Sequence, residues 1–390
     1  MDSIISARIS PEQEIVLHSI RVDHRKDDRI RELLHTQLNW STLRGFALRH
    51  RVLPLLYTRI KSLAEDLILE QEMHKLSDLY LVNAQRNLRL TRMLLRVLDL
   101  FSEKGIECIA LKGPVMAHQL YGDLSLRHFT DLDLLIHNRD YQRCSDVLMG
   151  ADFLPEFVVS RKEQPWMLRA ETEHQFYYQG DILDIHWALA ERGVYYPLKT
   201  EQFWHRVQHL EIFECTIPIL SPENLFLLLC VHGTKHKWEK LAWISDLAHF
   251  LNTFPELDWD SVLKQAEIKG FERVVYLGIL LAEKIGGAHF PASQMVRFRS
   301  DPIAQNLADD ALNTIISNDP THNEFYAINY SLRARERLTD RLYYIFDQTF
   351  VPKYVDWMTV SFPKMLYPAY YIYRPYRLLR KFSSHLLRIL

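Results

Sequence analysis

Glycine and cysteine are both scarce in this chain. Only 12 of the 390 residues are glycine, and neither a G-x-G-x-x-G nor a G-x-x-x-x-G-K-[ST] pattern occurs. Because those glycines let a backbone approach phosphate groups closely, the sequence gives no support for a dinucleotide-binding fold or a P-loop. The four cysteines are far apart and form no C-x-x-C pair. This argues against a cysteine-rich zinc site or a disulfide framework, and is typical of a reducing cytosol.

Long apolar runs and an excess of one charge are also missing. The longest apolar stretches, 225–231 and 274–282, fall far short of the ~18 residues that span a bilayer. The first sixteen residues have no apolar core of a secretory signal, so we expect a cytoplasmic protein without a transmembrane segment. With 47 basic and 49 acidic residues, the net charge is −2. A uniformly basic nucleic-acid coat and wholesale disorder are therefore excluded.

Helical periodicity covers most of the chain. Apolar residues recur every three or four positions in a long amphipathic segment, 75–103, and shorter helices are expected before residue 64. Ser221 followed by Pro222 is a typical helix start. Further helices are predicted beyond residue 190, at 224–231, 238–251, 260–285, 302–316 and 331–346.

Strand-like patterns are confined to one interval. Short apolar or alternating runs predict strands at 106–111, 131–136, 174–179 and 182–187, the last two joined by a turn at Gly180-Asp181. Helices are expected at 114–121 and 141–149. The chemistry of the chain is concentrated here.

The main candidate site consists of acidic residues in these strands. Asp131 and Asp133 are two residues apart and so point to the same face of a strand, and Asp184 and His186 share a face of another. A cluster of three carboxylates is costly unless cations occupy it. Mg²⁺ takes oxygen ligands and binds substrate phosphates as well, and two ions about 4 Å apart can serve phosphoryl transfer. We therefore predict a site for two Mg²⁺ ions, with Mn²⁺ as an alternative.

Basic residues near these strands are candidate phosphate ligands. Lys112 and Gly113 stand between a strand and a helix that begins at Pro114, where an ammonium and free N–H groups would meet phosphate oxygens. Arg127 adds a planar donor four residues before Asp131. His186 is expected either to orient Asp184 or contact phosphate, or to be a structural histidine.

A second polar cluster contains His232, Lys235 and His236, followed by Trp238 and Asp246. The two histidines have the spacing of zinc ligands on a helix, but the glutamate of H-E-x-x-H is absent, which disfavours a metalloprotease. These side chains either line the nucleotide or acceptor pocket or pack a helix end against its neighbour.

Taken together, the motifs resemble a known group. Leu111-Lys112-Gly113, Arg127, the run Asp131–Leu135 and Asp184-Ile185-His186-Trp187 resemble an uncharacterised bacterial nucleotidyltransferase-like family of the DNA polymerase β superfamily. The resemblance implies two Mg²⁺ ions and transfer of a nucleoside monophosphate. It also implies that Asp131 and Asp133 bind both ions, while Asp184 completes one metal site and helps to deprotonate the acceptor. Lys112-Gly113 stands where most superfamily members have Gly-Ser, so the lysine is expected to take over phosphate binding.

The C-terminal stretch 353–390 differs in composition. It contains seven basic residues against one acidic residue, Asp356, with tyrosines interleaved. An anionic partner, either RNA or a membrane surface, is therefore considered for it.

These observations predict an α+β protein with a small mixed sheet of the polymerase β type. The expected division is an N-terminal helical region (1–104), a nucleotidyltransferase core (105–190), a larger helical domain (191–350) and the basic C-terminal segment (351–390). The predicted function is the Mg²⁺-dependent transfer of a nucleoside monophosphate from ATP or another NTP to an acceptor hydroxyl or phosphate, with release of pyrophosphate. The acceptor is unidentified and is a peptide, a small molecule or RNA. The alternative is a non-catalytic nucleotide- or peptide-binding protein that keeps a degenerate form of the fold.

Overall fold

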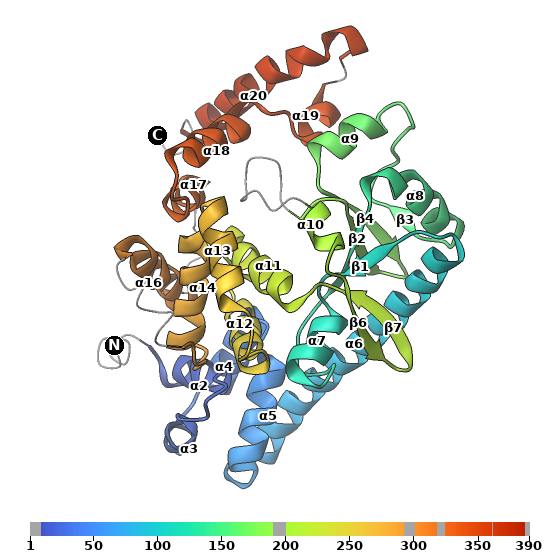
Figure 1. The fold of residues 1–390 in the computed structure, drawn as a ribbon. Coiled ribbons are helices and arrows are strands. Elements are labelled where there is room, and N and C mark those ends of the chain that lie inside the picture. The colour runs from blue at the N-terminus through green and yellow to red at the C-terminus, as the bar shows by residue number, and fades with distance from the viewer. Residues whose placement is uncertain (1–8, 190–199, 292–300, 318–323, 361, 387–390) are drawn as a thin grey trace.

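A mixed β-sheet and a large set of helices make up the protein in this computed structural model, which describes residues 9–189, 200–291, 301–317, 324–360 and 362–386 (Figure 1). The sheet has seven strands in the order β3-β4-β5-β2-β1-β7-β6. The strands are β1 (Cys108–Ala110), β2 (Asp131–Ile136), β3 (Leu154–Pro155), β4 (Glu173–Tyr178), β5 (Asp181–His186), β6 (Gln208–Ile212) and β7 (Cys215–Ile219).

The centre of the sheet is formed by β1, β2 and β5. Strand β2 runs antiparallel to β1 and parallel to β5, and β4 pairs antiparallel with the other edge of β5. The register pairs Asp133 with Asp184, so their side chains lie on the same face. Leu132 and Leu134 point to the opposite face and are buried there. This alternation explains how acidic residues occupy a strand that is otherwise apolar.

Helices precede, interrupt and follow the sheet. Those before and within the sheet region are α2 (Pro11–Ser19), α3 (Asp27–Leu34), α4 (Trp40–Arg49), α5 (Leu53–Ala64), α6 (Glu70–Glu103), α7 (Pro114–Tyr121), α8 (Tyr141–Gly150), α9 (Gln164–Ala170) and α10 (Glu201–Trp204). Those that follow are α11 (Pro222–Lys235), α12 (Leu241–Thr253), α13 (Trp259–Lys269), α14 (Glu272–Lys284), α16 (Pro302–Ser317), α17 (Glu324–Ala334), α18 (Leu338–Phe350), α19 (Tyr354–Thr359) and α20 (Tyr370–Leu386).

Two hydrophobic cores hold these layers together. One lies under the sheet and joins strand residues such as Leu134 and Ile185 to α6 and α8, with Phe101 and Leu148 fully buried. The other joins the N-terminal helices to α11, α12, α14 and α16. The N-terminal region therefore shares its core with helices that follow the sheet. The domain division made from the sequence stays a prediction.

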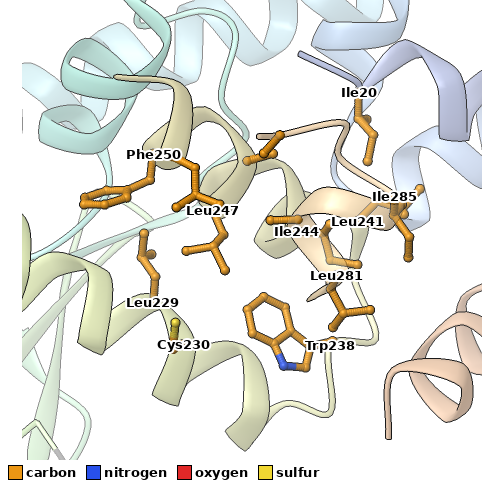
Figure 2. Packing of buried hydrophobic residues seen from close by; sticks show 14 of the residues in the cluster. Ile20, Leu229, Cys230, Trp238, Leu241, Ile244, Leu247, Phe250, Leu281 and Ile285 are labelled. Carbon is orange, nitrogen blue, oxygen red and sulfur yellow. The ribbon is translucent and has the colours of Figure 1, made fainter. Parts of the chain in front are cut away.

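Trp238 fixes the end of α11 in the second core. Figure 2 shows its indole among Leu241, Leu281 and other apolar side chains. Trp238 has a positive φ of 54°, and its indole N–H donates to the hydroxyl of Thr234 at 3.2 Å. The ring also lies directly over Gly233, where an added Cβ would come within 2.5 Å of it. Only glycine leaves room for this turn.

The predicted α+β class with a mixed sheet and flanking helices is confirmed, but part of the sheet was not predicted. Helical periodicity was expected throughout the region beyond residue 190, whereas β6 and β7 form an antiparallel hairpin there. Its two-residue turn, Phe213-Glu214, has positive φ at both positions without glycine or asparagine, which removes the usual sequence signal. The turn between β4 and β5 likewise lies one residue earlier than predicted, at Gln179-Gly180.

Several predicted helices also have different bounds. The segment 260–285 is two helices, because Gly270 adopts the left-handed conformation (φ 74°) that ends α13. The segment 238–251 begins only at Leu241, since Trp238 belongs to the preceding turn. The segment 331–346 is divided between α17 and α18.

The basic C-terminal segment folds as helices at the rim of the molecule (Figure 1). It is anchored to the sheet region, where the Tyr354 N–H donates to Glu171 at 2.7 Å and the Tyr354 ring stacks on Phe157. Residues 387–390 lie outside the described part of the chain. Among the described helices, none is long and apolar enough to cross a membrane.

Candidate active site

The three acidic residues predicted from the strands line one pocket. Asp131 and Asp133 come from β2 and Asp184 from β5, and all three face a cavity of about 430 Å³ between the sheet and α11. The pocket is closed on the other side by His232 and Lys235 of α11. The structure therefore brings together carboxylates and basic groups that lie far apart in sequence.

Asp133 is the most strongly bound of the three carboxylates. Its Oδ1 accepts a hydrogen bond from His186 Nε2 at 2.9 Å and lies 3.6 Å from Lys112 Nζ. Burial alone would raise the pKa of Asp133, but the Lys112 charge and the His186 hydrogen bond outweigh burial and lower the pKa well below its usual range. Asp133 is therefore ionised at every pH at which the protein would be active.

Asp184 has the opposite environment. Its side chain is buried and its Oδ1 has no hydrogen-bond partner. Burial, and then repulsion from the charge of Asp133, raise the pKa of Asp184 to about 7. The pKa of Asp131 is also raised, again by burial and then by Asp133. Full ionisation of all three groups thus requires additional positive charge.

His186 lies between two carboxylates. Its Nδ1 is 3.0 Å from Glu173 on β4, and its Nε2 contacts Asp133. Burial would lower the pKa of His186, but the hydrogen bonds to Asp133 and Glu173 raise it to about 9. The hydrogen bond from His186 lowers the pKa of Glu173 to about 2. At neutral pH this histidine is therefore an imidazolium that positions Asp133.

The carboxylate oxygens of the pocket are the type of ligand that a hard divalent cation such as Mg²⁺ prefers. The carboxylates of Asp131, Asp133 and Asp184 share one face, and Asp184 Oδ1 is buried without a donor. Among the described residues, no three His, Cys, Asp or Glu side chains are already gathered as the ligands of a bound ion are. Lys112 and His186 instead both contact the same oxygen of Asp133, Oδ1.

Lys112 and Gly113 lead from β1 into α7. The N–H of Leu111 donates to the carbonyl oxygen of Asp133 at 3.0 Å, which fixes the strand end beside the carboxylates. Gly113 has φ 66° and ψ −126°, a conformation that L side chains rarely adopt, and Pro114 begins the helix. This turn directs Lys112 into the pocket, where its Nζ lies 3.4 Å from His232 Nδ1.

Arg127 lines the pocket but is engaged by another residue. Its Nε and Nη2 donate to the two carboxylate oxygens of Asp246 on α12, both at 2.9 Å. Asp246 also accepts a hydrogen bond from the Tyr121 hydroxyl at 2.8 Å. Arg127 was predicted as a phosphate donor, whereas here its guanidinium joins the sheet to the helical layer.

The end of α11 supplies the second predicted cluster. His232, Lys235 and His236 all line the pocket, and Trp243 of α12 contacts both imidazole rings. Burial and the Lys112 charge lower the pKa of His232 well below its usual range. Burial, followed by the Lys235 and Lys112 charges, lowers the pKa of His236 to about 3. Both imidazoles are therefore neutral, while Trp238 lies in the core.

Other pocket residues were not found from the sequence. They have polar or aromatic side chains, and they include Arg51, His128, Glu173, Gln175, Lys240 and Trp243. Glu173 carried a usable signal, since it pairs with His186 across the β4–β5 hairpin. Arg51 carried none, because it reaches the pocket from the corner between α4 and α5, far away along the chain.

Comparison with known proteins bears on this site. A family described as an uncharacterised nucleotidyltransferase matches residues 36–287, more than half of the chain. The chain belongs to this family. It is thus a nucleotidyltransferase, as its resemblance to the polymerase β superfamily implied. The match includes the acidic strands, the Lys112-Gly113 turn and the end of α11, and also Arg51.

A search of solved structures matched parts of the chain to two antibiotic-resistance proteins, both at low TM-scores. The lincosamide antibiotic adenylyltransferase LnuA, solved with lincomycin, is 20% identical, with 35% of this chain and 83% of that chain covered and a TM-score of 0.26. The antibiotic-resistance factor ANT(2'')-Ia is 11% identical, with 47% and 91% covered and a TM-score of 0.33. No curated protein matches the sequence. At such TM-scores neither structure indicates where this nucleotidyltransferase binds its acceptor.

Proposed function

We propose that the protein transfers a nucleoside monophosphate from an NTP to an acceptor hydroxyl or phosphate in a Mg²⁺-dependent reaction that releases pyrophosphate. The observation that carries this proposal is the shared face of Asp131, Asp133 and Asp184 in a pocket that also contains Lys112 and Lys235. Acidic groups on one side and cations on the other match a nucleotide phosphate bound with a metal ion. NTP is thus the first substrate, and the acceptor is unidentified.

In this proposal, Asp131, Asp133 and Asp184 would hold Mg²⁺, which when bound would neutralise the charge that develops on the phosphate oxygens during transfer. The acceptor oxygen attacks the α-phosphorus, the bond to the β-phosphate breaks, and pyrophosphate leaves. Asp184 receives the acceptor proton, and its partnerless Oδ1 is the atom that supports this role.

The cationic side chains would bind the triphosphate. Lys112 approaches from the β1–α7 turn, Lys235 from α11, and Lys240 and Arg51 complete the basic side of the pocket. Arg51 lines the same pocket as Asp131 and His236. We assign Arg51 to the phosphates distant from the α-phosphorus.

In this proposal, two of the predicted domains supply different parts of the pocket. Residues 105–190 would provide the carboxylates and Lys112, and the helical segment 191–350 would close the pocket with His232, Lys235 and His236. Acceptor choice is assigned to the helical surfaces around the pocket, because the same sheet motif serves many acceptors.

The experiment is an assay of pyrophosphate release with each of the four NTPs, with and without MgCl₂. Each NTP labelled at the α-phosphorus is then offered with peptide, small-molecule and RNA acceptors. We expect label transfer and pyrophosphate release in equal amounts, both abolished by EDTA. Metal-independent release, or none with any combination while Mg-NTP still binds, would contradict the proposal.

A second candidate is a nucleotide-binding protein without turnover. One observation favours it. Lys112 and His186 form ion pairs with Asp133, so the chain's own cations neutralise part of the acidic cluster. Calorimetric titration with ATP distinguishes the two functions. Equal affinity for ATP with and without Mg²⁺, and no pyrophosphate, would favour this candidate.

A further inference from the structure

The C-terminal helices α18 and α20 carry an unusual amount of exposed apolar surface. Of the 25 large hydrophobic side chains that are exposed among the described residues, 14 lie between residues 338 and 379. Most folded monomers keep contiguous apolar patches small unless the patch binds something. This surface is distinct from the nucleotidyltransferase pocket, whose lining, in the part of the chain that the structure describes, ends at Trp243.

On α18 three of the six exposed apolar residues form one stripe. Leu338, Leu342 and Ile345 follow the i, i+4, i+7 spacing that places side chains on one face of a helix. Tyr344 and Asp347 are buried on the other side, where Lys353 Nζ lies 3.3 Å from an Asp347 oxygen. The polar contacts of α18 thus face the protein, and its apolar stripe faces solvent.

On α20 the same spacing recurs. Ile372, Tyr376 and Leu379 are all exposed, with Ile372 at 77% and Leu379 at 70% of full exposure. The buried Arg374 on the inner side donates to Asp356 at 2.9 Å. Helix α20 packs against α18 at the rim of the molecule (Figure 1). The two stripes therefore belong to neighbouring helices, and we call these six residues the rim patch.

The charge of this region is strongly positive. Between residues 338 and 390 there are eight basic and three acidic residues, and α20 contains no acidic residue at all. Two of the three acidic side chains, Asp347 and Asp356, are buried in ion pairs with Lys353 and Arg374. The net charge of the segment that carries the rim patch is therefore positive.

We propose that the rim patch docks on an anionic membrane surface. A helix with a strong apolar face, low overall hydrophobicity and basic flanks lies in the interface of such a membrane and does not cross it. Tyr376 suits this position, because its ring is apolar and its hydroxyl is polar. Pairing with a second copy would bring two like-charged surfaces together, and RNA offers no apolar phase for Leu338, Ile345 and Leu379.

The test is flotation of the full chain with vesicles of phosphatidylcholine alone or mixed with phosphatidylglycerol. We expect binding to the anionic vesicles, weakened by added salt because the attraction is screened. Ile372→Asp combined with Leu379→Asp should reduce this binding at least about tenfold, since two apolar groups that would enter the membrane surface are replaced by negative charges. The matched control is Leu81→Asp with Val82→Asp on α6, which changes two side chains of 50% and 59% exposure and should bind normally.

Three results would overturn the proposal. The first is no binding to anionic vesicles, and the second is binding that the Ile372→Asp/Leu379→Asp variant retains in full. The third is a dimer in light scattering that this variant converts to monomer, or an RNA complex that it abolishes, without vesicle binding. Circular dichroism of the variant shows that its helices remain, and unchanged transferase activity in solution separates this surface from the pocket.

Discussion

His186 Nε2 lies 2.9 Å from Asp133 Oδ1, and this contact, after the nearby charge of Lys112, lowers the pKa of Asp133. The imidazole is oriented from its other side by Glu173, 3.0 Å away. Because both partners raise the pKa of His186 to about 9, the ring carries a positive charge at neutral pH. The chain thus contains a fixed cation that keeps Asp133 ionised and correctly directed.

Replacing His186 tests this role. His186→Gln should lower the rate of pyrophosphate release by about 10- to 100-fold, because a residue that orients a metal ligand typically contributes that much. The Mg²⁺ concentration needed for half-maximal activity should rise, since Asp133 loses its orientation. Glu173→Gln, which removes only the outer partner, should give a smaller change in the same direction. An unchanged Mg²⁺ dependence in both variants would contradict this role.

Arg51 should act on nucleotide binding rather than on the chemical step. We expect Arg51→Gln to raise the KM for the NTP about tenfold with a smaller effect on kcat, because one charged hydrogen bond to a phosphate is lost. Steady-state kinetics with varied NTP measures both constants. Arg92→Gln, a change on an exposed position of α6, is the control and should leave both constants unchanged. An unaltered KM in Arg51→Gln would remove this residue from the site.

The turn at the end of α11 gives a stability prediction. Gly233→Ala should lower the free energy of unfolding by roughly 1–3 kcal/mol, because the new Cβ would lie 2.5 Å from the buried Trp238 ring. Gly45→Ala is the matched control, since that helix position has nothing within 4 Å and alanine favours helix. Chemical denaturation compares the two. Equal stability of both variants would mean that the ring has room to move.

His174, a buried histidine outside the pocket, should make the stability of the fold depend on pH. Burial lowers the pKa of His174 from 6.5 to about 4, and its Nδ1 contacts the Tyr141 hydroxyl at 2.8 Å. Between pH 6.5 and pH 4, His174 is therefore protonated in the unfolded chain but neutral in the folded chain. The free energy of unfolding decreases as the pH falls through this range. Between pH 7 and pH 5 this amounts to about 2 kcal/mol.

The measurement compares the wild type with His174→Gln by denaturation at both pH values. The loss on acidification should be about 2 kcal/mol smaller in the variant, because the groups common to both proteins cancel. Nuclear magnetic resonance of the His174 ring gives a direct check in the wild type. A ring that titrates near pH 6.5 would contradict the prediction.

The acidic strand was predictable because its pattern is local. Alternating Asp131, Leu132, Asp133 and Leu134 defines both a strand and its polar face within a few residues, and the structure has the strand at the predicted bounds. Ser221 likewise caps α11 through its own side chain, which accepts from the Asn224 N–H. Such signals depend on neighbours in the chain.

The remaining features depend on contacts between distant segments. The β6–β7 hairpin joins the sheet through the pairing of β7 with β1, and its turn at Phe213-Glu214 has two exposed residues at positive φ that no local preference predicts. The pairing of Arg127 with Asp246 could not be foreseen because Asp246 lies 119 residues further along the chain, and the assignment of Arg127 to phosphate stays a prediction. Arg51 could not be assigned at all, since it is placed by contacts between distant segments, such as the hydrogen bond from the Ala242 N–H of α12 to the carbonyl oxygen of the neighbouring His50.

The most direct test of the account is Mg²⁺-dependent pyrophosphate release by Asp133→Asn beside Asp78→Asn, an exposed substitution of the same kind on α6. The account predicts no detectable turnover for Asp133→Asn, with its circular dichroism spectrum unchanged, and wild-type turnover for Asp78→Asn. Wild-type, metal-dependent NTP consumption by a folded Asp133→Asn protein would contradict it.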